Sequence, residues 1–350
     1  MQNNESIMWK EIFQQPEAVF RTLEINRPLI MNIAKAVHER QIKTIILAGR
    51  GSSEHACQVA RYLFETKCRM VASIAAPSVI THYDGNIDLA NVLTIGVSQS
   101  GAAQDIYEVM NETIKQHGLC VSITNVRDSI MAGVGDFRMN LECGEEKSIT
   151  AAKSYLTQLT LLVAIAGYIS QDQGIIDLLD NLPKIIQKAL LLEPQVKHLV
   201  TCLRNTDSIM IIGRGLLYGL SLETELKIQE TCYLDARAYA SSDYRHGPIA
   251  TCQRFVPVIF FIADQQTNEC VLTLHERMKK EYSIFSIAIS NLPASITDAD
   301  IAIKLPVEYD GLSAVFVCAV FSQMLACQLS LARGYNPDTP IGVSKRTVTR

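Results

Sequence analysis

A hydroxyl-rich turn is the first candidate for binding chemistry. The apolar run Val92–Val97 leads into Ser98-Gln99-Ser100-Gly101, and a helical pattern follows from Ile106 to Met110. The turn therefore lies between the carboxyl end of a predicted strand and the amino end of a predicted helix, where free N–H groups and the helix dipole favour an anion. It lacks the G-x-x-x-x-G-K-S/T pattern of a Walker loop. The sequence therefore predicts an anion site, typical of phosphate, without a lysine.

A predicted helix supplies the first candidates for proton transfer. Between Leu222 and Glu230, the side chains of Glu223, Lys227 and Glu230 fall at positions i, i+4 and i+7, so they share one face. A carboxylate and an ammonium on one face suit proton transfer at a carbon atom if they are partly desolvated. The alternative is a surface salt bridge, which the spacing alone favours.

Two further candidates lie in segments without helical or strand periodicity. His246 precedes Gly247-Pro248 in a predicted loop, so we expect it at a surface or cleft, where a histidine can shuttle protons near neutral pH. Lys345 lies in a tail that follows the helix-breaking segment Asn336–Pro340, and an extended tail of this kind can cover a cleft. The alternatives are an incidental loop histidine and a solvated lysine, and both are favoured when these residues are considered alone.

The composition argues against several functional classes. With 350 residues, 48% of them apolar, the chain is long enough for about two packed domains. A net charge of −4 without a lysine or arginine cluster gives no support for nucleic-acid binding. The most apolar stretch, Leu312 to Ala332, contains serines and glutamines, so a buried helix is favoured over a membrane span. Ten scattered cysteines without a C-x-x-C pair are typical of a reducing cytoplasm, and of neither a disulfide framework nor a zinc site.

Apolar runs of strand length alternate with helical patterns, which is typical of parallel sheets with helical crossovers. A long helical region, Ala151–Gln171 and Ile176–Leu203, separates two sets of runs and predicts a helical bridge between two α/β units. The predicted strands are Thr44–Ala48, Met70–Ile74, Val92–Val97, Leu119–Thr124 and Phe137–Leu141, then Ser208–Ile212, Val256–Ile262, Ser283–Ile289 and Ile301–Leu305.

The two halves also repeat a short motif. An apolar strand runs into Gly49-Arg50-Gly51 in the first half and into Gly213-Arg214-Gly215 in the second, and a helical pattern follows in both. The shared strand–turn–helix context favours duplication over chance. Ser52-Ser53 follows the first motif and Leu216-Leu217 follows the second, so only the first half keeps hydroxyl groups for an anion.

Taken together, these segments resemble the SIS (sugar isomerase) family over nearly the whole chain. The nearest members are the isomerase half of glucosamine-6-phosphate synthase and the stand-alone SIS-type aminosugar-phosphate deaminases. The resemblance is carried by Trp9–Pro16, Gly51–Ser53, Ser98–Gly101, Glu146–Lys153, Glu223 to Glu230, Tyr239 to Pro248, and Ser344-Lys345.

The resemblance implies an α/β fold of two tandem, nested SIS domains, each a parallel sheet flanked by helices in a flavodoxin-like three-layer sandwich. It also implies a homodimer, with no metal and no redox cofactor. The expected parts are an N-terminal helical arm (1–22), a first SIS domain with the phosphate-binding loops (23–170), a helical bridge (171–203), a second SIS domain with the catalytic helix and histidine loop (204–332), and a C-terminal tail that closes the active site (333–350).

The resemblance also implies roles for individual residues. Glu230 matches the base that moves a proton between C1 and C2 of the sugar, and Lys227 matches a lysine near those carbons. His246 matches the ring-opening residue, which the neighbouring subunit supplies in this family, and Lys345 matches the tail lysine that meets the open-chain sugar. The phosphate-binding positions are Ser53, Ser98, Gln99 and Ser100, and the positions expected to contact the sugar are Gly51, Ser52, Ile149 and Ala151.

Three departures from the family pattern bear on the substrate. The synthase carries a glutaminase domain with an amino-terminal cysteine, whereas this sequence begins Met1-Gln2-Asn3, so we do not expect glutamine-dependent amidotransfer. The hydroxyl that usually follows the second serine of the loop is replaced by Ala103, so one phosphate bond is missing or Gln104 supplies it. Arg50 adds a cation near the phosphate or the dimer partner.

The expected function is that of a cytoplasmic aminosugar-phosphate deaminase and isomerase, with glucosamine 6-phosphate converted to fructose 6-phosphate and ammonia as the first choice. The pattern at residues 146–154 is closer to the deaminases than to the synthase. The alternatives are a fructosamine-6-phosphate deglycase or another phosphosugar isomerase, and, from a different class, a non-catalytic sugar-phosphate-binding module. We expect no nucleic-acid or membrane partner.

Overall fold

The structure, a computed structural model, describes residues 6–292, 298–307 and 311–345. The described residues divide into two compact units. The first-sheet unit contains residues 14–146, 153–183 and those from 344 onward, and the second-sheet unit contains those up to 13, 147–152 and 184–343. The chain therefore passes repeatedly from one unit to the other. The linear domain boundaries stay a prediction, and residues 1–5 of the expected arm and 346–350 of the expected tail lie outside the described residues.

The first-sheet unit is built on a five-stranded sheet in which every pairing is parallel. Its strand order is β2-β1-β3-β4-β5. The central strand β3 and its neighbour β4 are buried along their whole length, as their continuous apolar runs predict. The strands are β1 (Thr44–Ala48), β2 (Val71–Ile74), β3 (Val92–Ser98), β4 (Leu119–Thr124) and β5 (Phe137–Asn140).

The second-sheet unit repeats this topology. Its parallel strands have the order β7-β6-β8-β9-β10, which matches the first sheet strand for strand. The order 2-1-3-4-5 is that of flavodoxin-like folds. The prediction of two parallel α/β domains is therefore confirmed. The strands are β6 (Ser208–Gly213), β7 (Asp235–Ala240), β8 (Pro257–Ile262), β9 (Phe285–Ser290) and β10 (Ile301–Lys304).

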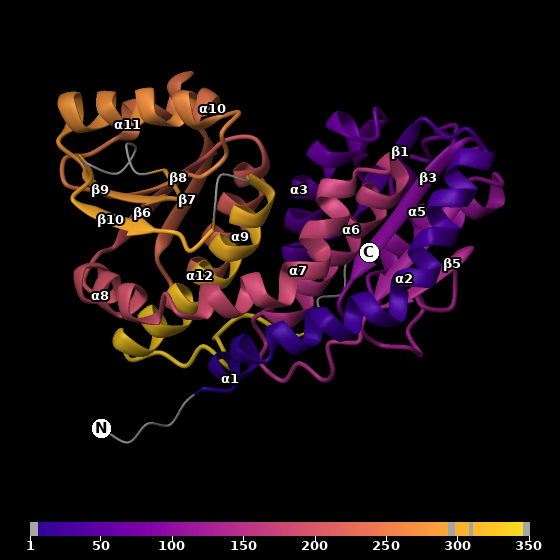
Figure 1. The fold of residues 1–350 in the computed structure, drawn as a ribbon, viewed down its shortest axis with the longest axis horizontal. Helices are drawn as coiled ribbons and strands as arrows, with labels where there is room; N and C mark the ends of the chain where they lie inside the picture. Colours follow the sequence, from indigo (N-terminus) through magenta and orange to yellow (C-terminus); the bar gives the residue numbers. More distant parts are fainter. Residues whose placement is uncertain (1–5, 293–297, 308–310, 346–350) are drawn as a thin grey trace. The chain divides into compact units, whose positions relative to one another are not determined.

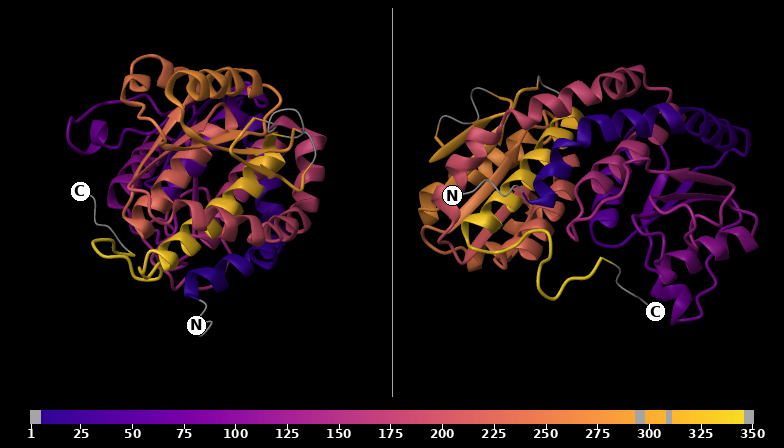
Figure 2. Two further views of the ribbon diagram at one scale, coloured as in Figure 1. Left: turned by 90° about the vertical axis from the view of Figure 1, so that its left-hand side faces the viewer. Right: turned by 90° about the horizontal axis from the view of Figure 1, so that it is seen from below.

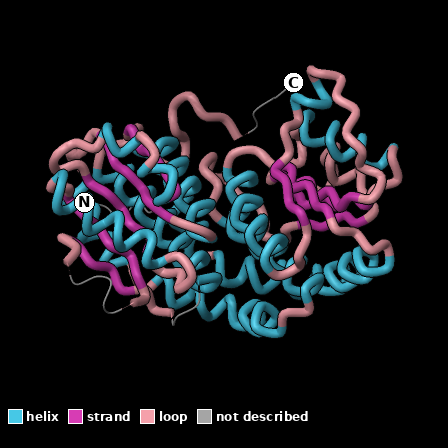
Figure 3. Tube along the Cα trace, turned by 90° about the horizontal axis from the view of Figure 1, so that it is seen from above, coloured by secondary structure: helices cyan, strands magenta, loops and turns pink. Residues whose placement is uncertain are grey.

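Helices cover both faces of each sheet, which gives each unit three layers (Figures 1 and 3). In the first-sheet unit, one face is covered by α2 (Gln15–Glu39), α3 (Ser52–Thr66) and α6 (Lys153–Ser170), and the other by α4 (Ser78–Thr81) and α5 (Gln104–Lys115). In the second-sheet unit the corresponding helices are α8 (Glu193–Leu203), α9 (Leu216–Cys232) and α12 (Gly311–Ala332), with α10 (Ser241–Arg245) and α11 (Asn268–Tyr282) on the other face.

Three elements have no counterpart in this repeat. The helix α1 (Ile7–Phe13) packs beside α12 in the second-sheet unit (Figure 2). The helix α7 (Gln173–Leu190) begins in the first-sheet unit and ends in the second-sheet unit. A short 3-10 helix, η1 (Pro248–Thr251), follows the histidine loop. The predicted helix over 176–203 is divided between α7 and α8, and Pro194 lies in the first turn of α8, where a missing N–H costs least.

The sequence missed one strand. The edge strand β7 has the sequence Asp-Ala-Arg-Ala-Tyr-Ala and alternates between exposed and buried positions, so it has no continuous apolar run. The prediction of a loop from Tyr239 to Pro248 is partly wrong. Tyr239 and Ala240 end β7, and Ser241–Arg245 forms the single-turn helix α10.

The helix α12 is long and apolar enough to cross a membrane, but 94% of its most apolar window is buried inside the protein. It packs against α8 and α9 in the second-sheet unit. Its serines and Gln323 are also buried, and Ser322 accepts a hydrogen bond from Thr224 of α9 (2.9 Å). The prediction of a buried helix is therefore confirmed.

The two Gly-Arg-Gly motifs adopt one backbone conformation. Gly51 (φ 54°, ψ −129°) and Gly215 (φ 60°, ψ −131°) are the residues that precede α3 and α9. Only glycine adopts this combination without strain. The matching conformation, element order and strand order support the interpretation that the two halves arose by duplication.

We expect Gly215→Ala to lower the free energy of unfolding by about 2 kcal/mol, because alanine is strained at this φ and its Cβ would lie 2.9 Å from Thr267 Cγ2. The measurement is urea unfolding followed by circular dichroism. The matched control is Gly133→Ala, which has an ordinary φ and no atom closer than 3.4 Å to the added Cβ, and it should change stability by less than about 0.5 kcal/mol. Equal effects of the two substitutions would contradict this account.

Candidate functional site

The serine loop, residues 98–101, lies where the topology of the first sheet reverses direction. Strands β1 and β3 are neighbours, and the chain leaves them toward opposite sides, which is the point where open α/β sheets bind ligands. Ser98 ends β3, and its Oγ accepts a hydrogen bond from the Gly101 N–H (3.1 Å). Gly101 has φ 62°, and a Cβ there would lie 2.0 Å from Ser129 Oγ, so only glycine fits.

The second part of this region is the first turn of α3. Ser52 and Ser53 begin the helix at the carboxyl end of β1, directly after Gly51. Ser53 is 7% exposed and Ser98 is 8% exposed. The N-cap positions of α3 and α5 are Gly51 and Ala103, and neither supplies a side-chain acceptor for the first N–H groups of its helix. The loop and the two helix starts therefore present hydroxyl and amide donors at one edge of the sheet.

Arg50 and Gln104, two residues near the serine loop, each pair with an acidic side chain. Arg50 donates from Nη2 and Nε to Asp105 Oδ2 (2.6 and 2.8 Å), and Asp105 is buried in the first turn of α5. The guanidinium therefore lies beside the loop but is paired with an acid. Gln104 donates from Nε2 to Glu108 Oε1 (2.7 Å) on the exposed side of α5.

A cavity of about 520 Å³ opens at the carboxyl ends of β3, β4 and β5. It joins two segments that are far apart in the sequence, because Gln99 and Ser100 of the serine loop and Lys345 of the tail all line it. The tail lysine therefore lies on a cavity wall, and its expected role there stays a prediction. The remaining lining residues are Asn125, Val126, Arg127, Asn140, Glu142, Gly144, Glu145 and Glu146.

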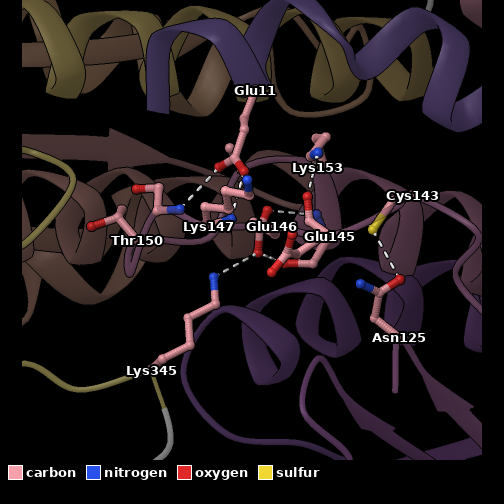
Figure 4. A network of polar contacts seen from close by, with 12 residues as sticks. Glu11, Asn125, Cys143, Glu145, Glu146, Lys147, Thr150, Lys153 and Lys345 are labelled. Carbon is pink, nitrogen blue, oxygen red and sulfur yellow. Dashed lines mark hydrogen bonds and ion pairs between the residues drawn. The ribbon is translucent and has the colours of Figure 1, made fainter. Parts of the chain in front are cut away.

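Glu146 is the centre of a polar network on this cavity wall (Figure 4). Its carboxylate accepts hydrogen bonds from the Ser154 N–H (3.0 Å) and Ser154 Oγ (2.6 Å), and from Lys345 Nζ (3.3 Å). Nearby, the buried Lys153 donates to the Glu145 carbonyl (2.8 Å) and fixes the backbone of the same wall. Burial raises the pKa of the adjacent Cys143 thiol to about 12, so this cysteine stays protonated at neutral pH.

The second-sheet unit contains the candidate proton-transfer group. Lys227 Nζ lies 2.7 Å from Glu230 Oε2 and 3.6 Å from Glu223 Oε1. Lys227 and Glu223 are each 1% exposed, whereas Glu230 is 18% exposed. The cluster is therefore not a solvent-exposed salt bridge. It is a buried pair with one carboxylate that reaches the surface, and this partial desolvation is what proton transfer at carbon needs.

The segment that carries Ile149 and Ala151 is held in place by two acids. Glu11 of α1 accepts hydrogen bonds from the backbone N–H groups of Lys147 (2.6 Å) and Ser148 (3.3 Å). The Asp338 carbonyl accepts one from the Ile149 N–H (3.1 Å). The Asp338 carboxylate also accepts from the N–H groups that begin α1, those of Ile7 (2.8 Å) and Met8 (2.7 Å). These bonds fix residues 147–149 within the second-sheet unit.

His246 directly follows the helix α10 and is exposed, as expected for a surface position. Its N–H donates to the Asp243 carbonyl (3.0 Å). Beneath it, Tyr244 is fully buried, and burial raises the pKa of its hydroxyl well above the usual range. The loop backbone is thus anchored by a buried aromatic ring while the imidazole faces outward.

Asp264 is a residue that the sequence reasoning missed. It follows β8 in the second half, as the serine loop follows β3 in the first. Its carboxylate accepts hydrogen bonds from the Gln266 N–H (3.2 Å) and Thr267 Oγ1 (3.1 Å), and it is 7% exposed. The second half therefore carries its own negative charge at the place where the first half offers hydroxyl groups.

The structure brings together Gln99, Ser100 and Lys345 in one unit, and Lys227, Glu223 and Glu230 in the other. The roles of all the expected site residues stay predictions. In the part of the chain that the structure describes, no three histidine, cysteine or acidic side chains are grouped so that they could hold a metal ion. Glu11 and Glu146 lie in segments that carry the family resemblance, but the sequence assigns no role to them or to Asp338, because each of the three also pairs with a distant segment.

Comparison with known proteins supports the resemblance. The family model described as SIS domain matches residues 40–167 and 202–333. The glutamine–fructose-6-phosphate aminotransferase (isomerizing) of Thermococcus kodakarensis is 27% identical over 97% of this chain. The match takes in 57% of that relative, so this chain spans less than two thirds of the relative's length.

Solved structures share the fold. The C-terminal domain of glucosamine-fructose-6-phosphate aminotransferase from Francisella tularensis superposes with a TM-score of 0.85 at 24% identity, and the match covers 96% of this chain and 99% of that one. Glucosamine-6-phosphate deaminase from Thermotoga maritima gives a TM-score of 0.76 at 21% identity, with coverage of 98% and 100%.

We expect Lys227→Met to lower the free energy of unfolding by about 3 kcal/mol, because it leaves the buried Glu223 without its cation. Glu230→Gln should lower the free energy of unfolding by only about 1 kcal/mol, since this side chain reaches solvent. The control is Lys197→Met, which breaks an exposed pair with Glu193 and should change stability by less than about 0.5 kcal/mol. Chemical unfolding measures all three, and a Lys227 effect as small as that of the control would contradict the buried-pair interpretation.

Proposed function

Because this chain belongs to the SIS domain family, we propose that it is an isomerase and deaminase of phosphorylated amino sugars. The first-choice reaction converts glucosamine 6-phosphate and water to fructose 6-phosphate and ammonia. We also propose that the protein works in the cytoplasm, without a cofactor, as a homodimer.

The observation that carries this proposal is the cavity that joins the serine loop to Lys345. A loop of neutral hydroxyl and amide donors at a helix start suits a phosphate group, and an ammonium on the same cavity suits the oxygen atoms of an open-chain sugar. A pure binding module needs the loop, but it has no need for a partly desolvated carboxylate such as Glu230.

The proposed chemistry is a proton transfer between adjacent carbons. His246 opens the sugar ring, and the Glu230 carboxylate then takes the proton from C2 of the open-chain aldehyde. The resulting enolamine regains the proton at C1, which leaves an imine at C2. Water adds to the imine carbon, and ammonia leaves as the ketone forms. Lys227 beside Glu230 and Lys345 on the cavity stabilise the negative charge that develops on oxygen during enolisation.

The names of two solved relatives support this choice of reaction. One is named a glucosamine-6-phosphate deaminase and another is the C-terminal domain of an aminotransferase that carries fructose 6-phosphate in its name. A panel of aminosugar phosphates and fructosamine phosphates, assayed for ammonia or amine release, separates the first choice from a deglycase. Tight binding without any release across the panel would favour the non-catalytic module.

We expect Glu230→Gln to reduce ammonia release by about 1000-fold, because the amide cannot accept the C2 proton. The affinity for the sugar phosphate should stay within about threefold of the wild type, since the phosphate loop is untouched. A coupled ammonia assay and calorimetric titration measure these quantities. Glu225→Gln, on the same helix, serves as the control with normal turnover. Lost binding in a folded Glu230→Gln variant would instead make Glu230 structural.

The proposed sharing of His246 between subunits has a complementation test. Glu230→Gln and His246→Ala homodimers should each be inactive. Random subunit exchange should restore about a quarter of the wild-type activity, because half of the dimers are mixed and each mixed dimer has one intact site. No recovery, with exchange verified by differently tagged subunits, would place both residues of a site in the same subunit.

A further inference from the structure

Glu146 is a buried carboxylate to which the proposed reaction gives no role. Its side chain is 0% exposed, yet it lies on the wall of the cavity that contains Gln99 and Ser100. Removing a carboxylate from water is costly unless hydrogen-bond donors replace the water. Ser154, in the first turn of α6, supplies two such donors, one from the backbone and one from the hydroxyl. The carboxylate is therefore fixed by a helix before any ligand arrives.

The third donor to this carboxylate is Lys345, at 3.3 Å from Nζ to Oε2 (Figure 4). Lys345 lies in a tail segment without helix or strand, and its side chain is 28% exposed. A lysine has four rotatable side-chain bonds, and fixing them costs rotamer entropy. A rigid, buried acceptor offsets this cost, because it holds the ammonium in one place on the cavity wall.

We propose that Glu146 is the positioning residue that holds the Lys345 ammonium ready for the open-chain sugar, with Ser154 as the support of the carboxylate. This inference rests on the proposed function. In the wild type, the ammonium is in place when negative charge develops on the carbonyl oxygen, so no reorganisation is needed at that step. Without the carboxylate, the substrate itself must order the tail lysine.

The first test measures the contact without turnover. An acylating reagent specific for amines labels Lys345 in the intact protein, and peptide mass spectrometry gives its rate. Glu146→Gln should raise this rate at least fivefold, because the ammonium loses its buried, charged acceptor. The matched control is Glu142→Gln, which removes a charge from the same cavity but whose carboxylate pairs with Arg127, and it should leave the rate unchanged. An unchanged rate in folded Glu146→Gln would overturn the proposal.

The second test separates positioning from a structural role. Glu146→Gln should lower kcat about 30-fold, while the affinity for inorganic phosphate stays unchanged. When Glu146→Gln is added to Lys345→Met, kcat should fall by less than a further threefold below that of Lys345→Met alone, because the effect of Glu146 acts through the lysine. If the double variant instead shows the product of the two single reductions in kcat, the proposal is overturned. Should Glu146→Gln fail to fold, Ser154→Ala provides the same test, with a smaller change in the same direction.

The two tests also distinguish failure of this inference from failure of the proposed function. A wild-type protein that releases no ammonia from any substrate in the panel would refute the proposed function. The labelling rate of Lys345 would still decide whether Glu146 holds the lysine. Normal turnover with an unchanged labelling rate in Glu146→Gln would refute the positioning role alone.

Discussion

All strands within each sheet run in the same direction, and the rest of the structure depends on this constraint. Parallel strands need a crossover between each pair, so every strand-to-helix turn falls at the same edge of its sheet. In the first sheet this edge collects the serine loop after β3, the start of α3 after β1, and the cavity at the ends of β3 to β5. Residues such as Ser53 and Ser98, which are distant in sequence, become neighbours in function because the strands that precede them are hydrogen-bonded to each other.

The sequence predicts most of this architecture, because buried parallel strands have continuous apolar runs and the turns between them have glycine and serine. The strand β7 was not predicted, because it is an edge strand whose exposed charged residues, such as Arg237, interrupt any continuous apolar run. The sequence predicts contacts where they are local, as in the pairing of Lys227 with Glu230. It does not predict contacts between distant segments. Glu146, for example, pairs with Lys345, which lies 199 positions further along the chain.

The duplicated halves show how one scaffold supports different tasks. Gly51 and Gly215 keep the same backbone conformation, so the turn geometry has survived in both halves. The side chains around the turn have diverged. The first half offers the hydroxyl groups of Ser53 and Ser98, whereas the second half has Asp264, whose carboxylate already takes the local donors. A buried carboxylate repels an anionic ligand, so this difference favours the first half as the place of the proposed phosphate group.

The cap of α1 has a consequence for how the protein is made. The N–H groups of Ile7 and Met8 find their acceptor in the Asp338 carboxylate, 331 and 330 residues later in the chain. During synthesis on the ribosome, α1 emerges 330 residues before this acceptor is translated. A nascent chain stalled before residue 338 therefore leaves these two N–H groups of α1 without the Asp338 carboxylate.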